Sequence, residues 1–215
     1  MQTIAVIDFE TTGLGPTSGG RATEVAAVLV RDGVVVDAWA SLRNSGAWVP
    51  PLIQALTGIS NDMLATAPRS SQVMQELARI TSGCPLVAHN AAFDRGFWRA
   101  EMERAGLQPD PAHEFACTVL LSRRLWPEAP SHGLGEMTRF HGLQLQGRAH
   151  RAMADARVTA ELWLKVQQEV GRRFALDLDG QSVDHALLSE LQRTPVRWLR
   201  RGLVEHVKSR RALTC

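Results

Sequence analysis

The N-terminal part of the chain alternates short apolar runs with turn residues. Residues 2–8 form an almost unbroken apolar run, which is typical of a strand that is buried on both faces. Residues 24–31 and 34–42 are rich in β-branched and apolar side chains. They are joined at Asp32 and Gly33, a dipeptide that favours a tight hairpin turn. This pattern predicts a first strand beside an antiparallel hairpin.

Farther along the chain, segments with helical character alternate with short apolar runs. Residues 85–89 predict a fourth strand, residues 143–147 predict a last one, and Asn90 is suited to cap the helix that follows the fourth strand. Three early strands followed by this alternation predict an α/β fold with a mixed sheet. The predicted helices cover residues 50–57, 69–82, 91–105, 117–126, 132–141 and 151–171.

The length of 215 residues allows one large domain, or one domain with an appendage. Because residues 172–182 are polar, we expect a folded domain over residues 1–172 and a basic helical extension over residues 173–215. Residues 191–215 carry seven Lys and Arg against the single acid Glu205. This excess of positive charge is suited to an anionic partner, and a solvated amphipathic helix explains it almost as well.

The basic extension allows two interpretations. Trp198 lies among several arginines, a combination that proteins use to bind single-stranded nucleic acid. Leu199, Leu203 and Val207 recur at helical spacing, which favours a helix docked on the body of the protein or on a partner. The sequence favours neither interpretation over the other.

Composition and cysteine usage exclude several classes. The 45% share of hydrophobic residues is ordinary for a soluble globular protein. No stretch approaches the roughly 20 apolar residues of a membrane helix, and the N-terminus is typical of a strand rather than a signal peptide, so we expect no membrane partner. Cys84, Cys117 and Cys215 lack paired spacing. We therefore expect no disulfide or zinc site, buried Cys84 and Cys117, and a reducing, cytoplasmic setting.

Two acids, Asp8 and Glu10, end the first apolar strand. Alternation places both on one face of the strand, while Phe9 points away into the core. At ~4 Å and an effective dielectric of ~20, two carboxylates repel by about 4 kcal/mol. A divalent cation removes this cost, and oxygen ligands suit Mg²⁺ or Mn²⁺. Two solvated acids at a strand end are the alternative interpretation.

Three more residues could join this pair. Asp94 falls in the first turn of the helix after the fourth strand, where its charge also suits a helix N-terminus. Asp155 follows His150 by five residues, and five steps of about 100° cannot place both on one side of a helix. We therefore expect His150 on the loop that enters the helix and Asp155 in its first turns, so that both can face one ion.

The order of these residues resembles the three exonuclease motifs of the DEDDh exonucleases. The matching segments are Asp8-Phe9-Glu10-Thr11-Thr12-Gly13, then His89-Asn90 with Asp94, then His150 with Asp155. They are most similar to the members that resemble the DNA polymerase III epsilon proofreading subunit, and the similarity covers about residues 1–170. A sister class has Tyr in place of the His, and this sequence contains no tyrosine.

The resemblance implies a ribonuclease H-like fold, with a five-stranded mixed sheet flanked by helices. It also implies two divalent metal ions, Mg²⁺ or Mn²⁺. Asp8, Glu10 and Asp155 would hold the first ion. Asp8 would also reach the second ion, with help from Asp94, and His150 would be the general base.

Substrate contacts are expected around the first and second motifs. The loop of Thr11, Thr12, Gly13 and Leu14 can bring amides and hydroxyls to a phosphate or a terminal sugar, and the resemblance implies that Leu14 wedges between the last two bases. A buried core leucine is the alternative for Leu14. Asn90 and Phe93 are further candidates, with helix capping for Asn90 and packing on Phe97 for Phe93 as the structural alternatives.

The predicted function is a metal-dependent 3′→5′ exonuclease that releases nucleoside monophosphates from single-stranded DNA ends, with a DNA polymerase subunit as a further expected partner. One alternative is an exonuclease that processes RNA 3′ ends, similar to ribonuclease T or oligoribonuclease. Contact with the 2′-hydroxyl separates DNA from RNA, and the sequence assigns that contact to no residue. A second alternative is a non-catalytic subunit that binds a polymerase or nucleic acid.

Overall fold

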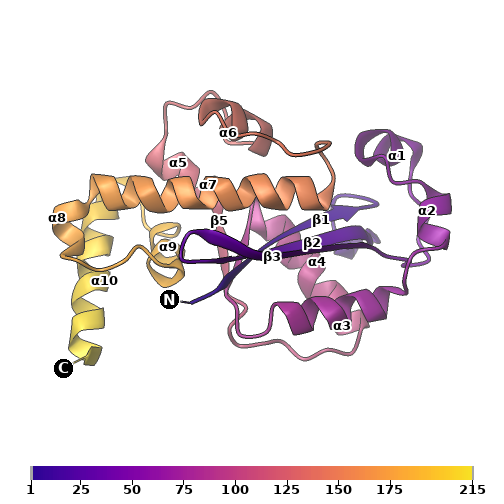
Figure 1. Cartoon of the computed structure of the whole chain (residues 1–215), viewed down its shortest axis with the longest axis horizontal. Coiled ribbons are helices and arrows are strands. Elements are labelled where there is room, and N and C mark those ends of the chain that lie inside the picture. Colours follow the sequence, from indigo (N-terminus) through magenta and orange to yellow (C-terminus); the bar gives the residue numbers. More distant parts are fainter. Residues whose placement is uncertain (1, 215) are drawn as a thin grey trace.

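The computed structural model describes residues 2–214, and within this range a five-stranded mixed sheet runs through the middle of the molecule (Figure 1). The spatial order of the strands is β3-β2-β1-β4-β5. The first three pair antiparallel, whereas β4 pairs parallel with both β1 and β5. The strands are β1 (Ile4–Thr11), β2 (Ala22–Arg31), β3 (Val34–Leu42), β4 (Leu86–Ala88) and β5 (Phe115–Cys117). This architecture confirms the predicted α/β fold with a mixed sheet.

Helices cover both faces of the sheet. The long helix α7 runs along one face, while α3 and α4 lie on the other (Figure 1). Two short 3₁₀ turns, η1 and η2, complete the described elements. The bounds are α1 (Pro51–Thr57), α2 (Asn61–Ala65), α3 (Ser70–Ile80), α4 (Ala91–Arg104), α5 (Thr118–Leu125), α6 (Leu134–Phe140), α7 (Ala152–Arg173), α8 (Ala175–Leu178), α9 (His185–Leu191), α10 (Leu199–Thr214), η1 (Pro16–Ser18) and η2 (Val196–Trp198).

Side chains of β1 alternate between the two halves of the core. Val6 packs in the cluster under α7, whereas Ile7 and Phe9 pack in the opposite cluster with α3 and α4. Full burial of each such side chain stabilises the fold by roughly 1.5–3 kcal/mol. Burial on both faces explains why the apolar run of β1 has no polar alternation. The end of this strand is thereby held rigidly between two helical layers.

The predicted hairpin is confirmed, and its turn has the expected backbone. Asp32 and Gly33 both have positive φ, 52° and 79°, as a two-residue hairpin turn of type I′ requires. Residues 22–31 and 34–42 pair antiparallel on either side of this turn. Gly has no Cβ to resist this conformation, and Asp tolerates it better than most residues do.

The last strand predicted over residues 143–147 is wrong, because this segment is a mostly exposed loop. The alternation of Leu143 and Leu145 with two glutamines imitated a half-buried strand. The fifth strand is instead β5, whose three residues are too few to show a period. Gln192 covers its outer edge: its side-chain amide donates to Phe115 O at 3.0 Å and accepts from Cys117 N at 2.7 Å.

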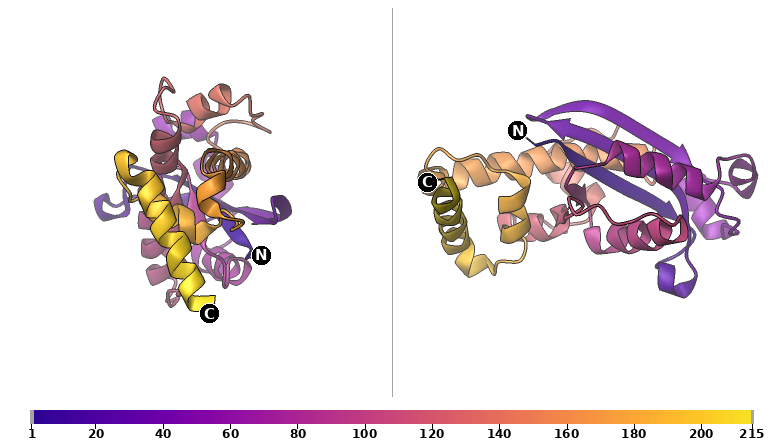
Figure 2. Two further views of the ribbon diagram at one scale, coloured as in Figure 1. Left: turned by 90° about the vertical axis from the view of Figure 1, so that its left-hand side faces the viewer. Right: turned by 90° about the horizontal axis from the view of Figure 1, so that it is seen from below.

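The C-terminal helices pack against the body of the protein. Leu187, Leu191, Leu199, Leu203 and Val207 belong to the same buried cluster as the apolar face of α7. Two views show α8, α9 and α10 gathered at one end of the molecule, opposite α1 and α2 (Figures 1 and 2). The helical spacing of Leu199, Leu203 and Val207 thus places them on the face of α10 that packs against the rest of the protein.

The cysteines and the helix lengths bear on two expectations. Cys84 and Cys117 are free and buried, as predicted, and Cys215 lies outside the described residues. Among the helices of residues 2–214, none combines the length and the apolar character that crossing a membrane requires. The cellular compartment stays a prediction.

Candidate active site

The candidate site forms where β1 ends, beside the N-termini of α4 and α7. Glu10 is buried and Asp8 is half-buried, both on the face of β1 that α7 covers. Across the strand pair, Asp8 lies opposite Ala26 and Glu10 lies opposite Glu24. The register shifts directly after Glu10, and such a bulge turns the end of a strand away from the regular ladder.

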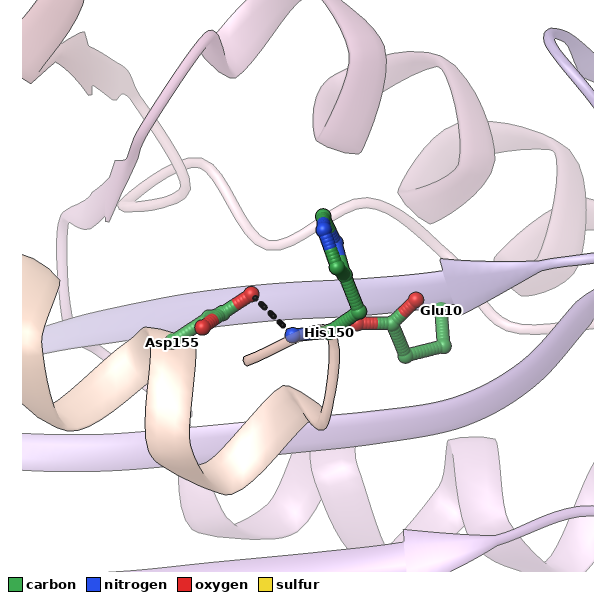
Figure 3. A group of neighbouring side chains, drawn as sticks. All are labelled: Glu10, His150 and Asp155. Atoms are coloured by element: carbon green, nitrogen blue, oxygen red, sulfur yellow. Dashed lines mark hydrogen bonds between the residues drawn. The ribbon is translucent and has the colours of Figure 1, made fainter. Parts of the chain in front are cut away.

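The structure brings Glu10, His150 and Asp155 together (Figure 3). One possible ligand atom from each side chain lies within 4.8 Å of the other two. His150 is exposed on the loop before α7, with a φ of 60°, and its backbone N–H donates to Asp155 Oδ2 at 3.2 Å. Asp155 lies in the first turn of α7. This arrangement of loop and helix is the one that the five-residue spacing predicted.

Asp94 joins the site from the opposite helical layer. It lies in the first turn of α4, is buried, and accepts a hydrogen bond from Phe9 N at 3.2 Å. Phe9 stands between Asp8 and Glu10 in β1, so this bond fixes α4 to the strand end that carries both acids. Asp94 and Asp155 therefore approach the end of β1 from two different helices.

Asn90 does not cap α4, so this structural prediction is wrong. Its backbone is left-handed, with φ 64° and ψ 48°, and its side chain makes no capping hydrogen bond. An N-cap residue normally has an extended backbone that aims its side chain at the first free amides. The amide of Asn90 is instead exposed at the start of α4.

Without a cation, the crowded carboxyl groups hold their protons to a higher pH than ordinary acids do. Burial, and the neighbouring Asp155, Glu24 and Asp94 carboxylates, raise the pKa of Glu10 to about 8. Burial also raises the pKa of Asp94 to about 8 and that of Asp155 above its ordinary value. For Asp8, burial and four surrounding acids raise the pKa well above the usual range. Oxygen donors that repel one another in this way fit a divalent cation, which would replace the protons.

The loop after β1 is shaped by its own hydroxyls. Thr11 Oγ1 donates to Gly13 O at 2.7 Å, and Thr12 Oγ1 accepts from Arg21 N at 3.0 Å. Leu14 at the tip is 93% exposed, so the alternative of a core leucine is wrong. The structural alternative for Phe93 is correct in part, because this half-buried ring packs on Phe97 with a centroid distance of 5.0 Å.

Two groups of ion pairs near the site were not identified from the sequence. Buried Glu24 pairs with Arg151, the residue that follows His150. Buried Glu101 of α4 pairs with Arg21, which ends the loop after β1, and with fully buried Arg43. The sequence shows only that a charged residue lies within an otherwise apolar strand or helix. Their partners depend on the folded arrangement.

The fold and the site define a class of protein. A mixed sheet in the order β3-β2-β1-β4-β5, with flanking helices, is the ribonuclease H-like arrangement that the motifs implied. A family model described as "Exonuclease" (RNase_T) matches residues 5–163. The chain belongs to this exonuclease family, and the resemblance to DEDDh exonucleases is confirmed.

Curated relatives share about a third of the aligned residues. The "3'-5' exonuclease DinG" of Bacillus subtilis (strain 168) is 35% identical over 170 residues, which are 79% of this chain and 18% of that protein. The "DNA polymerase III PolC-type" of Staphylococcus haemolyticus (strain JCSC1435) is 35% identical over 168 residues, 78% of this chain and 12% of that protein. The chain thus spans less than a fifth of the length of either relative.

Solved structures share the fold over most of the chain. Exonuclease X in complex with 5′ overhanging duplex DNA superposes with a TM-score of 0.64 at 29% identity, covering 78% of this chain and 93% of that one. A structure of exonuclease I has a TM-score of 0.71 at 19% identity, covering 83% of this chain and 44% of that one. At this lower identity the second likeness concerns the fold alone.

Proposed function

We propose that this chain is a metal-dependent 3′→5′ exonuclease that removes nucleoside monophosphates from single-stranded DNA ends. The observation that carries the proposal is the convergence of Glu10, His150 and Asp155 within 4.8 Å at the end of β1. Asp94 is bonded to the same strand end, and Asp8 is close enough for its charge to interact with the other acids. The name of the Bacillus subtilis relative, a 3′-5′ exonuclease, agrees with this activity.

In this proposal, Asp8, Glu10, Asp94 and Asp155 hold two divalent ions, Mg²⁺ or Mn²⁺. Two such ions would supply an activated water and would stabilise the leaving 3′-oxygen. Burial raises the pKa values of Glu10 and Asp94 to about 8 and those of Asp8 and Asp155 above their ordinary values, so bare carboxylates are disfavoured here. The protein therefore positions the acids and relies on cations to compensate their charge.

His150 acts as the general base in this proposal. Its side chain is exposed on the loop before α7 and stands beside Glu10 and Asp155 (Figure 3). An imidazole can take a proton from an attacking water near neutral pH. The hydrogen bond from His150 N to Asp155 Oδ2 ties the backbone of the base to one of the proposed metal ligands.

The end of the substrate is held by the residues around β1 and α4. Leu14 extends into solvent from the tip of the loop and wedges between the last two bases. The backbones of Thr11, Thr12 and Gly13 approach the terminal phosphate or sugar. Asn90 and the exposed part of Phe93 contact the same nucleotides from the start of α4.

The direct test incubates the purified protein and Mg²⁺ or Mn²⁺ with 5′-labelled single-stranded DNA and RNA, with Asp8→Ala as the inactive control. A metal-dependent ladder of shortened DNA supports the proposal. A ladder on RNA alone would favour the RNA-processing alternative. No product on either strand would favour a non-catalytic subunit. Association with a polymerase subunit stays a prediction, for which the PolC-type relative is the motivation.

A further inference from the structure

An arginine-lined groove leads from the start of α4 toward the C-terminal helices. Its first part is a cavity of about 230 Å³ whose lining includes Asn90, Arg95, Arg123 and Arg193 and, among the described residues, no acid. Its second part is a more open cavity of about 420 Å³ around Trp198. Arg193 lines both cavities, so the two adjoin at this side chain.

We propose that this groove binds the single-stranded nucleic acid upstream of the 3′ end, along a path from Asn90 to Trp198. The inference rests on the proposed function, because Asn90 at its near end is one of the residues proposed to hold the terminal nucleotides. A strand that leaves the site at Asn90 would enter the arginine-lined cavity directly. The groove would thus hold the substrate while its end is cut.

The charge of the first cavity suits a phosphate backbone. Arg95 and Arg123 are exposed, and neither forms an ion pair within the described part of the chain. Arg193 pairs with Glu114, but both side chains are well exposed. Such surface pairs contribute little to stability, so a phosphate can replace Glu114 readily. Arginine forms bidentate hydrogen bonds with phosphate, which makes these three side chains suitable ligands.

The position of Arg193 is set by its buried neighbour. Gln192 is only 5% exposed, and its side-chain amide forms two hydrogen bonds with the edge of β5, to Phe115 O and from Cys117 N. These bonds fix the end of α9 against the sheet. Arginines from α4, α5 and the end of α9, far apart in the sequence, thereby line one cavity.

The far end of the groove carries an aromatic surface. Trp198 is 47% exposed, although Leu199 and Leu203 beside it are buried in the core. The guanidinium groups of Arg197 and Arg201 lie 5.6 and 5.8 Å from the centre of its ring. A base that displaces one of these guanidinium groups can stack on the ring while the arginines bind the phosphates, and such stacking is a common way to bind single strands without sequence preference.

Two acids line this second cavity, and both have partners. Glu190 interacts with His206 at 2.6 Å, and Glu205 pairs with Arg201 at 2.8 Å. Arg193 and Arg201 line the same cavity. The two linings together hold four arginines against these two acids, so the path is positive, as an anionic strand requires.

The test compares a long substrate with one too short to reach the groove. The double variant Arg123→Glu/Arg193→Glu is assayed on (dT)20 and on the p-nitrophenyl ester of thymidine 5′-monophosphate. The matched control is Arg79→Glu/Arg172→Glu, whose side chains are 70% and 74% exposed, close to the 68% of Arg193, and lie outside both cavities. Circular dichroism and thermal unfolding verify that both variants fold.

We expect the groove variant to lose at least about tenfold in kcat/KM on (dT)20, mainly through KM, and to retain its rate on the small ester. In EDTA, fluorescence anisotropy with (dT)20 should give weaker binding. The slope of log affinity against log salt should be shallower by about 1.4, as expected for two lost single-strand phosphate contacts. Trp198→Ala should weaken binding of both (dT)20 and (dA)20 by roughly 5- to 100-fold.

The proposal would be overturned if Arg123→Glu/Arg193→Glu and Trp198→Ala both kept the wild-type affinity and KM for (dT)20. An equal loss in the matched control would overturn it as well. The two proposals fail separately. If the wild-type protein hydrolyses neither substrate, the exonuclease proposal is wrong, and the anisotropy in EDTA still decides whether the groove binds the strand.

Discussion

Glu24 of β2 and Arg151, the residue before α7, form a two-point ion pair. Arg151 Nε donates to Oε2 at 2.9 Å and Nη2 donates to Oε1 at 2.6 Å. The same carboxylate accepts from Ala152 N at 3.0 Å, so it also binds a free amide at the start of α7. Glu24 lies directly opposite Glu10, and Arg151 compensates the repulsion between them. The pair ties the segment that carries His150 and Asp155 to the strand beside Glu10.

The ion pair should stabilise both the fold and the site. We expect Glu24→Gln to lower the free energy of unfolding by about 2 kcal/mol, the range for a hydrogen bond to a charged group, because Arg151 is partly solvated. Turnover should also fall, since the start of α7 is no longer fixed. Urea unfolding and steady-state kinetics measure the two effects. Glu136→Gln, which breaks an exposed pair with Arg139, is the control and should change stability by less than about 0.5 kcal/mol. Wild-type stability in Glu24→Gln would contradict this role.

His150 should contribute to the chemical step more than to metal binding. We expect His150→Ala to lower turnover by roughly 10²- to 10⁴-fold, the usual range for loss of a general base. Because Asp8, Glu10, Asp94 and Asp155 remain, Mn²⁺ affinity measured by calorimetry should change little. Wild-type turnover in this variant would remove His150 from the mechanism.

The clustered acids should lower the stability of the metal-free protein and should be required for metal binding. We expect Asp8→Asn to raise the melting temperature in EDTA, because it removes one of several clustered carboxyl groups whose ionisation burial and mutual repulsion disfavour. The same variant should lose Mn²⁺ affinity and activity, and Asp155→Ala should lose both as well. Differential scanning calorimetry with and without Mn²⁺ provides the comparison. A lower melting temperature for Asp8→Asn in EDTA would show that the Asp8 carboxyl group does not destabilise the metal-free protein.

The raised pKa values predict a specific dependence of stability on pH. Glu10 and Asp94 have a pKa of about 8 in the folded protein and ordinary values of about 4 when unfolded. Between these values the folded state binds more protons than the unfolded state, so its stability falls as pH rises from 5 to 8. We therefore expect the melting temperature in EDTA to fall over this range, and saturating Mn²⁺ to reverse the trend. A melting temperature in EDTA that increases from pH 5 to 8 would show that Glu10 and Asp94 do not have raised pKa values in the folded protein.

Local patterns predicted the elements that carry the proposed ligands. The apolar run that ends in Asp8 and Glu10 is β1, and the five-residue spacing placed His150 on a loop and Asp155 in α7 correctly. Both predictions depend only on the periodicity of neighbouring residues. The first four strands of the sheet were also predicted, from local apolar runs and the hairpin turn.

The remaining features depend on contacts between distant segments. Glu24 faces Glu10 only in the observed register of β1 against β2, and no periodicity defines that register at a strand end. The fifth strand escaped prediction because its three residues show no period, and its edge is satisfied by Gln192, the residue after α9 far along the chain. Asn90 looked like a helix cap because its residue type favours that role, whereas it lies in the turn after β4 with a left-handed backbone.

A crystal soaked in Mn²⁺ and measured at the manganese absorption edge tests the central claim most directly. If the acids from β1, α4 and α7 form one cation site, an anomalous peak will lie within coordination distance of carboxylate oxygens of Glu10 and Asp155, and it will disappear in Asp155→Ala. An active protein whose manganese binds elsewhere, with Glu10 and Asp155 free of the ion, would contradict the account.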